Sequence, residues 1–402
     1  RCNTAVGLSA LAANTTASNN VAVGYDSLKA NITGHSNVAV GFDTLCSNTT
    51  GSVNTAVGCN ALSSNTTGSS QVAVGFDALS TNTTGLYNVG IGRQSLKSNT
   101  TTSGNTAVGH QSLCANTTGL SNTAVGCAAL LCNTTGCLNT AVGVGSLNAT
   151  TTGVQNTGVG SGLMNSLTEG CHNTAVGSSS LRSVTTGGCN IAMGVCALRE
   201  NTGSCNTALG TCSLFYNTTA DNNTAVGYNS LCKNTTGASN VALGTNSLAT
   251  QTTNTQNTAV GYNALCLNTA NENTAVGYES LKNNAGGYYL TAVGKDSGLS
   301  NTTGAYGAYV GRYAAKANTT GFGNSVLGAN AFCSNTTGGS NVAVGLCALQ
   351  SNTTAFCNTA VGASALLANT TGANNTGVGK DNLKANTTGD KNTALGTGAL
   401  AA

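Results

Sequence analysis

A 17-residue repeat runs through the whole chain of 402 residues, and it constrains the fold more than any other feature. Aligned on the glycine of a recurring V-G dipeptide, the repeat occurs 24 times between Gly7 and Gly396. Twenty-one of the 23 intervals are 17 residues and two are 16, with the consensus N-T-A-V-G-x-x-x-L-x-x-N-T-T-G-x-x. We therefore predict a single continuous repeat array over residues 1–402. Because it starts without Met and stops within a repeat, we expect it to be part of a longer fibre without visible caps.

Each position of the repeat carries its own residue type. The residue before this anchor glycine is apolar in all 24 copies, and the fourth residue after it is Leu, Met or Phe in 22. The second residue before it is Ala in 19 copies and Gly in three, and the fourth before it is Asn in 21. Such fixed positions indicate that equivalent residues lie over one another.

Seventeen residues are too few for the paired helices of the common helical solenoids, whose repeats are about 33 to 47 residues long. The N-T-A-V segment is short, β-branched and bounded by Asn and Gly, which indicates a strand. We predict an all-β parallel β-solenoid or β-roll of 24 coils, with a second short strand around the Leu and a turn at N-T-T-G. At ~4.8 Å per stacked strand the array would be a rod of about 115 Å, whose handedness the sequence does not specify.

The strand alanine, two residues before each anchor glycine, predicts a contact surface. If the flanking Thr and Val fill the coil, alternation places this alanine on the outside, where small residues allow close approach of another backbone. We predict a lengthwise packing seam between identical chains; the alternative is a flattened coil with Ala inside and Val outside. The seam residues are Ala5, Ala22, Ala39, Ala56, Ala73, Ala107 and Ala124.

Composition excludes several classes of protein. Charged residues make up 6% of the chain and the formal net charge is +3, so no basic patch for nucleic acid is expected. No run approaches the ~20 apolar residues of a membrane-spanning helix, so membrane insertion is not expected. Pro is absent and 40% of residues are hydrophobic, which excludes collagen and argues against disorder.

The pentapeptides N-T-A-V-G and N-V-A-V-G, as in Asn54-Thr55-Ala56-Val57-Gly58, resemble the head repeats of trimeric autotransporter adhesins. They are also similar to repeat arrays of viral and bacterial tail fibres. The resemblance implies a homotrimer of β-rolls packed along their length, an extracellular or cell- or virion-surface location, and an adhesive or spacer function. This coil is longer than that of the adhesin heads and carries an added N-T-T-G turn. No neck, coiled-coil stalk or membrane anchor is visible, so the autotransporter mechanism is not supported.

Nineteen N-x-[ST] triplets allow two interpretations. The first is a series of N-glycans on an extracellular fibre; the second is a structural turn, because Asn tolerates left-handed geometry and the Thr pair persists where the Asn is lost. Sixteen triplets share one offset and three do not. The possible glycosylation sites are Asn14, Asn31, Asn48, Asn65, Asn82, Asn99, Asn116, Asn133, Asn148, Asn217, Asn222, Asn234, Asn301, Asn318, Asn335, Asn352, Asn369, Asn374 and Asn386.

Seventeen cysteines also allow two interpretations, disulfides in an oxidising compartment or small core residues. Residues stacked one coil apart are close enough for a disulfide. The possible disulfide cysteines are Cys189 with Cys205, Cys196 with Cys212, Cys46 with Cys59, and Cys114 with Cys127. Zinc is not expected, because no C-x₂-C pair occurs.

Neither an enzyme nor a cofactor is expected, because the three histidines and eleven acidic residues are scattered over distant coils. The candidates for surface contact, including stacking on sugars, are aromatic residues directly after anchor glycines; they could equally be half-buried turn residues. They are Tyr25, Phe42, Phe76, Tyr228, Tyr262 and Tyr278.

The sequence therefore predicts an extracellular structural fibre, a stiff spacer or adhesive shaft that associates with copies of itself, as a trimer and even end to end. Three alternatives remain open. The shaft could itself bind surface glycans, its spaced Thr residues could bind ice, or the chain could form amyloid-like fibrils through exposed strand edges.

Overall fold

A computed structural model describes residues 2–401, and each repeat in it contains one three-residue strand. The strand is the T-A-V or V-A-V segment directly before the anchor glycine. The strands of residues 1–202 are β1 Thr4–Val6, β2 Val21–Val23, β3 Val38–Val40, β4 Thr55–Val57, β5 Val72–Val74, β6 Val89–Ile91, β7 Thr106–Val108, β8 Thr123–Val125, β9 Thr140–Val142, β10 Thr157–Val159, β11 Thr174–Val176 and β12 Ile191–Met193. Those of residues 203–402 are β13 Thr207–Leu209, β14 Thr224–Val226, β15 Val241–Leu243, β16 Thr258–Val260, β17 Thr274–Val276, β18 Thr291–Val293, β19 Ala308–Val310, β20 Ser325–Leu327, β21 Val342–Val344, β22 Thr359–Val361, β23 Thr376–Val378 and β24 Thr393–Leu395.

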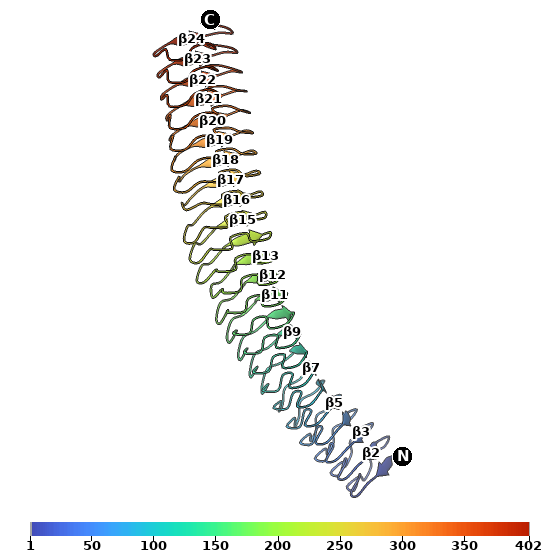
Figure 1. The fold of residues 1–402 in the computed structure, drawn as a ribbon. Coiled ribbons are helices and arrows are strands. Elements are labelled where there is room, and N and C mark those ends of the chain that lie inside the picture. The colour runs from blue at the N-terminus through green and yellow to red at the C-terminus, as the bar shows by residue number, and fades with distance from the viewer. Residues whose placement is uncertain (1, 402) are drawn as a thin grey trace. The chain divides into compact units, whose positions relative to one another are not determined.

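The chain divides into two compact units, Arg1–Thr202 and Gly203–Ala402, and each is a stack of twelve coils. Within each unit a strand pairs in parallel with the next strand in sequence (Figure 1). The pairing is in register by position: Val21 lies opposite Val38, Ala22 opposite Ala39 and Val23 opposite Val40. The structure thus confirms the predicted all-β parallel solenoid with a 17-residue repeat.

The predicted second strand around the Leu is wrong, because that segment is a turn in the described residues. Its Leu has a left-handed backbone, with φ of 52° at Leu45 and 48° at Leu113. The residue two positions earlier, such as Asp43, also has a positive φ, and so has the last residue of the coil, such as Val53. Left-handed residues reverse the chain sharply and interrupt extended pairing. Three such residues per coil therefore form the corners of the coil.

The strand alanines face into the coil, and the predicted packing seam on them is wrong. Six of the seven predicted seam residues are fully buried: Ala22, Ala39, Ala56, Ala73, Ala107 and Ala124. The seventh, Ala5, lies in β1 and is exposed. The first and third residues of each strand face outward instead, so the alternative of a flattened coil is the observed arrangement. The physical reason is that the narrow interior already holds the Leu and two Asn side chains, which favours a small residue at this position.

The interior of each coil combines apolar and amide side chains. In the coil of Gly41, Ala39 and Leu45 are fully buried, and so are Asn37 and Asn48. The anchor glycine has a φ of +138°, and a Cβ on it would lie 2.8 Å from the carbonyl oxygen of Gly58 in the next coil. Both the backbone conformation and this close approach require glycine at the anchor.

Two adjacent coils have a larger residue at the strand alanine position: Tyr309 in β19, which is fully buried, and Val326 in β20. Gly298 and Ala315 stand where Leu stands in other coils, and Gly307 stands where Asn does. A Cβ on Gly307 or Gly298 would overlap the Tyr309 ring. The hydroxyl of Tyr309 accepts a hydrogen bond from Asn318 Nδ2 at 3.3 Å. The ring therefore occupies the space that three smaller residues leave, and burial raises the pKa of its hydroxyl.

Candidate functional site

Two ladders of asparagine amides run through the interior of both units, and the turn ladder is interrupted where Thr150, Leu167 and Val184 replace Asn in three successive coils. We call the Asn seven residues after the anchor the turn Asn and the Asn four residues before it the strand Asn. Nδ2 of the turn Asn48 donates to Asn31 Oδ1 in the preceding coil and to the carbonyl of Gly51, both at 2.9 Å. Nδ2 of the strand Asn37 donates to the same Gly51 carbonyl at 2.9 Å. One carbonyl thus joins the two ladders, and these amide donors gain partners that offset their burial.

The ladder explains why Gly follows N-T-T in the repeat. A Cβ on Gly51 would overlap Asn48 Oδ1 and the carbonyl of Gly68 in the next coil. Outside the ladder, Thr49 Oγ1 donates to the Thr66 carbonyl at 3.1 Å, and this bond recurs along much of the chain. The N-T-T-G segment is therefore a structural turn in which three of four residues have fixed bonding or steric roles.

Burial of the turn Asn residues favours the structural turn over N-glycosylation, because a glycan on Nδ2 would have to pass through the packed interior of the folded coil. Asn14 and Asn386 are half-buried, and the other fourteen turn Asn residues at this offset are fully buried. These are Asn31, Asn48, Asn65, Asn82, Asn99, Asn116, Asn133, Asn217, Asn234, Asn301, Asn318, Asn335, Asn352 and Asn369. The remaining three predicted sites lie off the ladder: Asn222 and Asn374 are exposed and Asn148 is half-buried.

All seventeen cysteines are free in the structure. Cys46 and Cys59 take different positions in neighbouring coils, and Cys46 Sγ lies 3.3 Å from the carbonyl oxygen of Ser63. Cys127 Sγ lies 3.9 Å from His110 Nδ1. Each of the other two predicted pairs, Cys189 with Cys205 and Cys196 with Cys212, has one member in each unit. No predicted disulfide is formed in this structure.

Partial burial makes several of these thiols poor nucleophiles. It raises the pKa of Cys46, Cys114, Cys232 and Cys266, each of which lies five residues after an anchor glycine. A raised pKa keeps the thiol protonated at neutral pH, and the thiolate is the reactive form. These four cysteines behave as small apolar side chains at the edge of the core.

The aromatic residues that follow anchor glycines are exposed and stack on one another. The ring centroids of Tyr25 and Phe42 are 5.2 Å apart, and those of Tyr262 and Tyr278 are 5.3 Å apart. The Lys295 ammonium lies 5.3 Å from the centroid of Tyr278. The predicted contact candidates therefore do lie on the surface, but four of the six already use a ring face for stacking.

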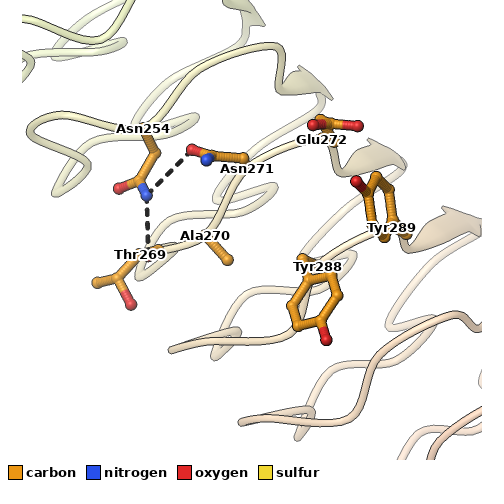
Figure 2. Close-up of a pocket in the computed structure, with 7 residues that line it drawn as sticks. All are labelled: Asn254, Thr269, Ala270, Asn271, Glu272, Tyr288 and Tyr289. Carbon is orange, nitrogen blue, oxygen red and sulfur yellow. Dashed lines mark hydrogen bonds between the residues drawn. The ribbon is translucent and has the colours of Figure 1, made fainter.

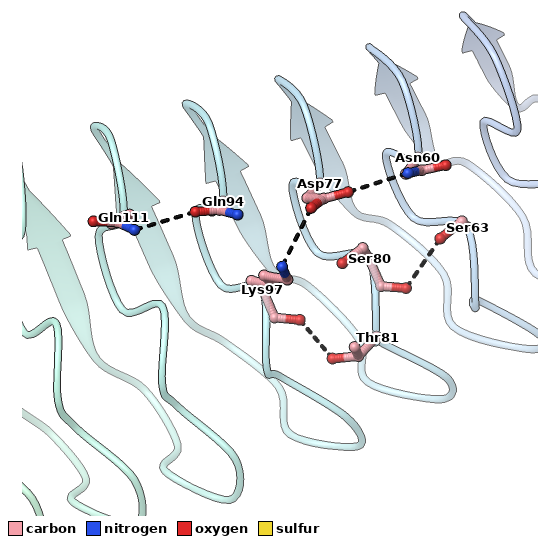
Figure 3. Close-up of polar contacts among 8 residues, drawn as sticks. All are labelled: Asn60, Ser63, Asp77, Ser80, Thr81, Gln94, Lys97 and Gln111. Carbon is pink, nitrogen blue, oxygen red and sulfur yellow. Dashed lines mark hydrogen bonds and ion pairs between the residues drawn. The ribbon is translucent and has the colours of Figure 1, made fainter.

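The position two residues after the anchor glycine is polar in many coils, and these side chains lie beside the aromatic residues. Asn60 Nδ2 donates to Asp77 Oδ1 at 3.2 Å, and Lys97 forms an ion pair with Asp77 at 3.3 Å (Figure 3). Gln111 Nε2 donates to Gln94 Oε1 at 3.1 Å in the same column. These contacts link neighbouring coils along the surface.

In the second unit a residue of this column forms an ion pair with the lysine three residues later in the chain. Glu279 Oε1 lies 2.8 Å from Lys282 Nζ. The hydrogen bond from Lys282 lowers the pKa of Glu279, and the same contact raises the pKa of Lys282. Both side chains remain partly exposed, so the pair adds little stability.

The outward side of the strands forms a uniform surface within each unit. We define the strand face as the first and third side chains of β1–β24. Its first positions are Thr, Val, Ile, Ala or Ser, its third positions are Val, Ile, Leu or Met, and none is ionisable. Val142 is 36% and Met193 43% exposed. An uncharged row of this kind is unusual on a protein surface, where large apolar patches mark contact sites.

The described residues contain no group of three or more His, Cys, Asp or Glu placed to hold a metal ion. Within residues 2–401, no helix has the length and apolar character needed to cross a bilayer. No protein-family model matches the chain, and neither does any curated protein sequence. The surfaces of the coil stack are therefore the basis for a functional proposal.

Proposed function

We propose that the chain is a structural shaft, an extracellular spacer built by stacking identical coils. The observation that carries this proposal is the in-register pairing of successive strands within each unit, together with the amide ladders that join runs of successive coils. Each coil supports its neighbours through the same bonds, so the stack resists opening at any one coil. Each unit of twelve coils would extend ~50 Å along its stacking direction at ~4.8 Å per strand.

We propose further that the shaft associates lengthwise with copies of itself through the strand face. A second copy has the same spacing between coils, so its methyl groups can fit between those of the first along the whole stack. If each outward side chain contributes about 40 Å², one unit offers on the order of 1,000 Å², comparable to the ~800 Å² per partner of a standard interface. This face replaces the alanine seam, and a homotrimer is one arrangement it permits.

Lengthwise association is tested by the oligomeric state of the full chain. We expect light scattering after size-exclusion chromatography to give an oligomer that V125K with V159K converts to monomer without loss of β-sheet signal. Val125 is 37% and Val159 41% exposed, so Lys fits in the folded coil. The matched control is L120K with L138K, two loop residues off the strand face that are at least as exposed. Lengthwise association would be refuted if the wild-type protein were a monomer at tens of micromolar. It would also be refuted if the control variant dissociated the oligomer as much as V125K with V159K does.

Ice binding is a second candidate function that one observation favours. The first position of five successive strands, β7 to β11, is Thr, so hydroxyl and methyl groups repeat at about 4.8 Å along an uncharged face. The same surface would then face water rather than a second copy. Thermal hysteresis of the wild-type protein that is abolished by T140K, in the middle of this row, would support ice binding. A wild-type protein without thermal hysteresis would refute ice binding.

A further inference from the structure

The repeat is interrupted at one place in the second unit. The coil from Gly261 to Gly277 is one residue short, and its turn is N-T-A-N-E in place of N-T-T-G-x-x. The preceding coil has Asn254 where most coils have the turn glycine. Departures from an otherwise consistent pattern concentrate at functional sites. This site therefore differs in kind from the uniform surfaces of the shaft.

A hollow of about 290 Å³ lies on the surface at this turn. Figure 2 shows amide side chains on one side of it and two tyrosine rings on the other. Its volume is at the lower end of the range for small-molecule sites. The lining residues are Asn254, Thr269, Ala270, Asn271, Glu272, Tyr288 and Tyr289.

Hydrogen bonds fix the amide side of the hollow. Asn254 Nδ2 donates to the carbonyl of Thr269 at 2.9 Å and to Asn271 Oδ1 at 3.3 Å. The same Oδ1 accepts from the backbone N–H of Thr255 at 2.9 Å. These bonds use Oδ1 of Asn271 and Nδ2 of Asn254. Within the described residues, Asn271 Nδ2, Asn254 Oδ1 and the Glu272 carboxylate have no protein partner, so one donor group and two acceptor groups are available to a ligand.

The tyrosine side of the hollow is held by contacts between aromatic rings on the surface. The rings of Tyr288 and Tyr289 meet edge to face with centroids 5.3 Å apart, and Tyr306 in the next coil lies 5.3 Å from Tyr288 and 5.5 Å from Tyr289. The Tyr306 hydroxyl donates a hydrogen bond to Tyr288, which raises the pKa of Tyr306. Tyr288 is 42% and Tyr289 50% exposed. In an edge-to-face contact one of the two rings presents only its edge, so that ring keeps its faces for a ligand.

We propose that this hollow binds a neutral pyranose sugar, as a free sugar or as the end of a surface glycan. The axial C–H groups of a pyranose would pack on a tyrosine ring face. Its neighbouring hydroxyls, which both donate and accept, would bond to Asn271 Nδ2 and to the oxygens of Asn254 and Glu272. Glu272 is the one ionisable carboxylate among the lining residues, so the hollow repels anions and favours an uncharged sugar. This proposal goes beyond the shaft and does not depend on self-association.

The chemistry of the hollow would also suit a quaternary ammonium group, since tyrosine ring faces and a carboxylate attract cations. The amide donor distinguishes the two ligands. Asn271 Nδ2 can bond to a sugar hydroxyl but not to a cation, which has no acceptor. Binding that needs Asn271 therefore indicates a sugar.

The test is saturation-transfer NMR on the full chain with four separate probes: glucose, galactose, mannose and N-acetylglucosamine, each at up to ~20 mM, well above the millimolar affinity expected of one small hollow. We expect at least one to bind in the millimolar range, with transfer strongest to its axial ring protons. Affinity should fall about tenfold in Y288A and about fivefold in N271A, which lose an aromatic face and a hydrogen-bond donor. The control is Y228A, which removes a similarly exposed tyrosine outside the hollow and should leave affinity unchanged.

Circular dichroism would verify that each variant keeps its β-sheet signal, and Y289F, which changes no ring face, provides a second folded reference. No transfer to any of the four sugars, or a loss as large in Y228A as in Y288A, would overturn the proposal. Binding of tetramethylammonium that is insensitive to N271A, with no sugar binding, would overturn it in favour of a cation site. Sugar binding by a monomeric shaft would leave the proposal intact while refuting lengthwise association.

Discussion

Replacing a turn asparagine tests whether the N-T-T-G segment is structural. Asn335 is fully buried, and its Nδ2 donates to Asn318 Oδ1 at 2.7 Å and to the carbonyl of Gly338 at 3.0 Å. Its Oδ1 accepts from Asn352 Nδ2 at 2.9 Å. In N335L, the Gly338 carbonyl keeps its bond from the strand Asn324 at 2.8 Å. Asn318 Oδ1 and one N–H of Asn352 are left buried without a partner.

The expected cost follows from these two orphaned groups. Each costs about 2 kcal/mol when buried without a partner, and the added apolar burial of Leu recovers about 1 kcal/mol in total. The free energy of local opening should therefore fall by about 3 kcal/mol, which is about 150-fold in hydrogen-exchange protection. The measurement is native-state hydrogen exchange of the backbone amides in the turns on either side of residue 335.

The chain offers a matched control in T337A. This change removes the same N-x-[ST] triplet, but Thr337 is exposed and its side chain lies outside the ladder. We expect protection within about threefold of the wild type, because exposed substitutions change stability by about 0.5 kcal/mol or less. If N335L and T337A lowered protection equally, or if N335L changed it no more than a surface substitution does, the amide ladder would not stabilise the turn.

Glycan mapping, coil deletion and a cavity variant test other features of the fold. In a eukaryotic secretory host, peptide mass spectrometry should find N-glycans at Asn148, Asn222 or Asn374 and at no fully buried turn Asn; a glycan on the buried ladder of folded protein would contradict this. Deletion of residues 109–125, one whole coil, should leave the midpoint of urea denaturation almost unchanged, because the coils on either side can stack on one another in the same register. Deletion of half a coil from the same start should break this register and unfold the neighbouring coils. Equal effects of the two deletions would refute the stacking register. Y309A should lower the free energy of unfolding by about 3–5 kcal/mol through the cavity it leaves, as measured by urea denaturation, and a loss below about 1 kcal/mol would show that the coil collapses around the space.

The stacking of coils could be predicted from sequence because it depends only on spacing. An insertion-free repeat with β-branched residues before an anchor glycine leaves few folds other than a parallel solenoid. The direction of the strand side chains could not be predicted in the same way. Apolar residues are usually buried, which favours Val40 inside and Ala39 outside, whereas the structure has the reverse. What decides the direction is the width of the coil, which depends on where the corners fall.

The corners themselves could not be predicted, because a left-handed Leu such as Leu45 is disfavoured by local preference. Burial of the Leu side chain and the fixed bonds of the turn impose that conformation, and both are properties of the folded stack. The hollow beside Tyr288 was also missed, although a signal was present: the short interval between Gly261 and Gly277 marks it in the sequence. In a repeat this regular, irregular spacing is as informative as the consensus.

The buried Tyr309 also has a consequence for how a gene with this repeat can change. Unequal recombination between repeated DNA segments adds or removes whole coils, and most such exchanges would join compatible partners. The coils that contain Gly298, Gly307 and Tyr309 are different, because a Cβ at either glycine would overlap the tyrosine ring. These coils must be inherited as one block, and an exchange with a breakpoint inside it would place a ring against Leu or Asn and be eliminated by misfolding.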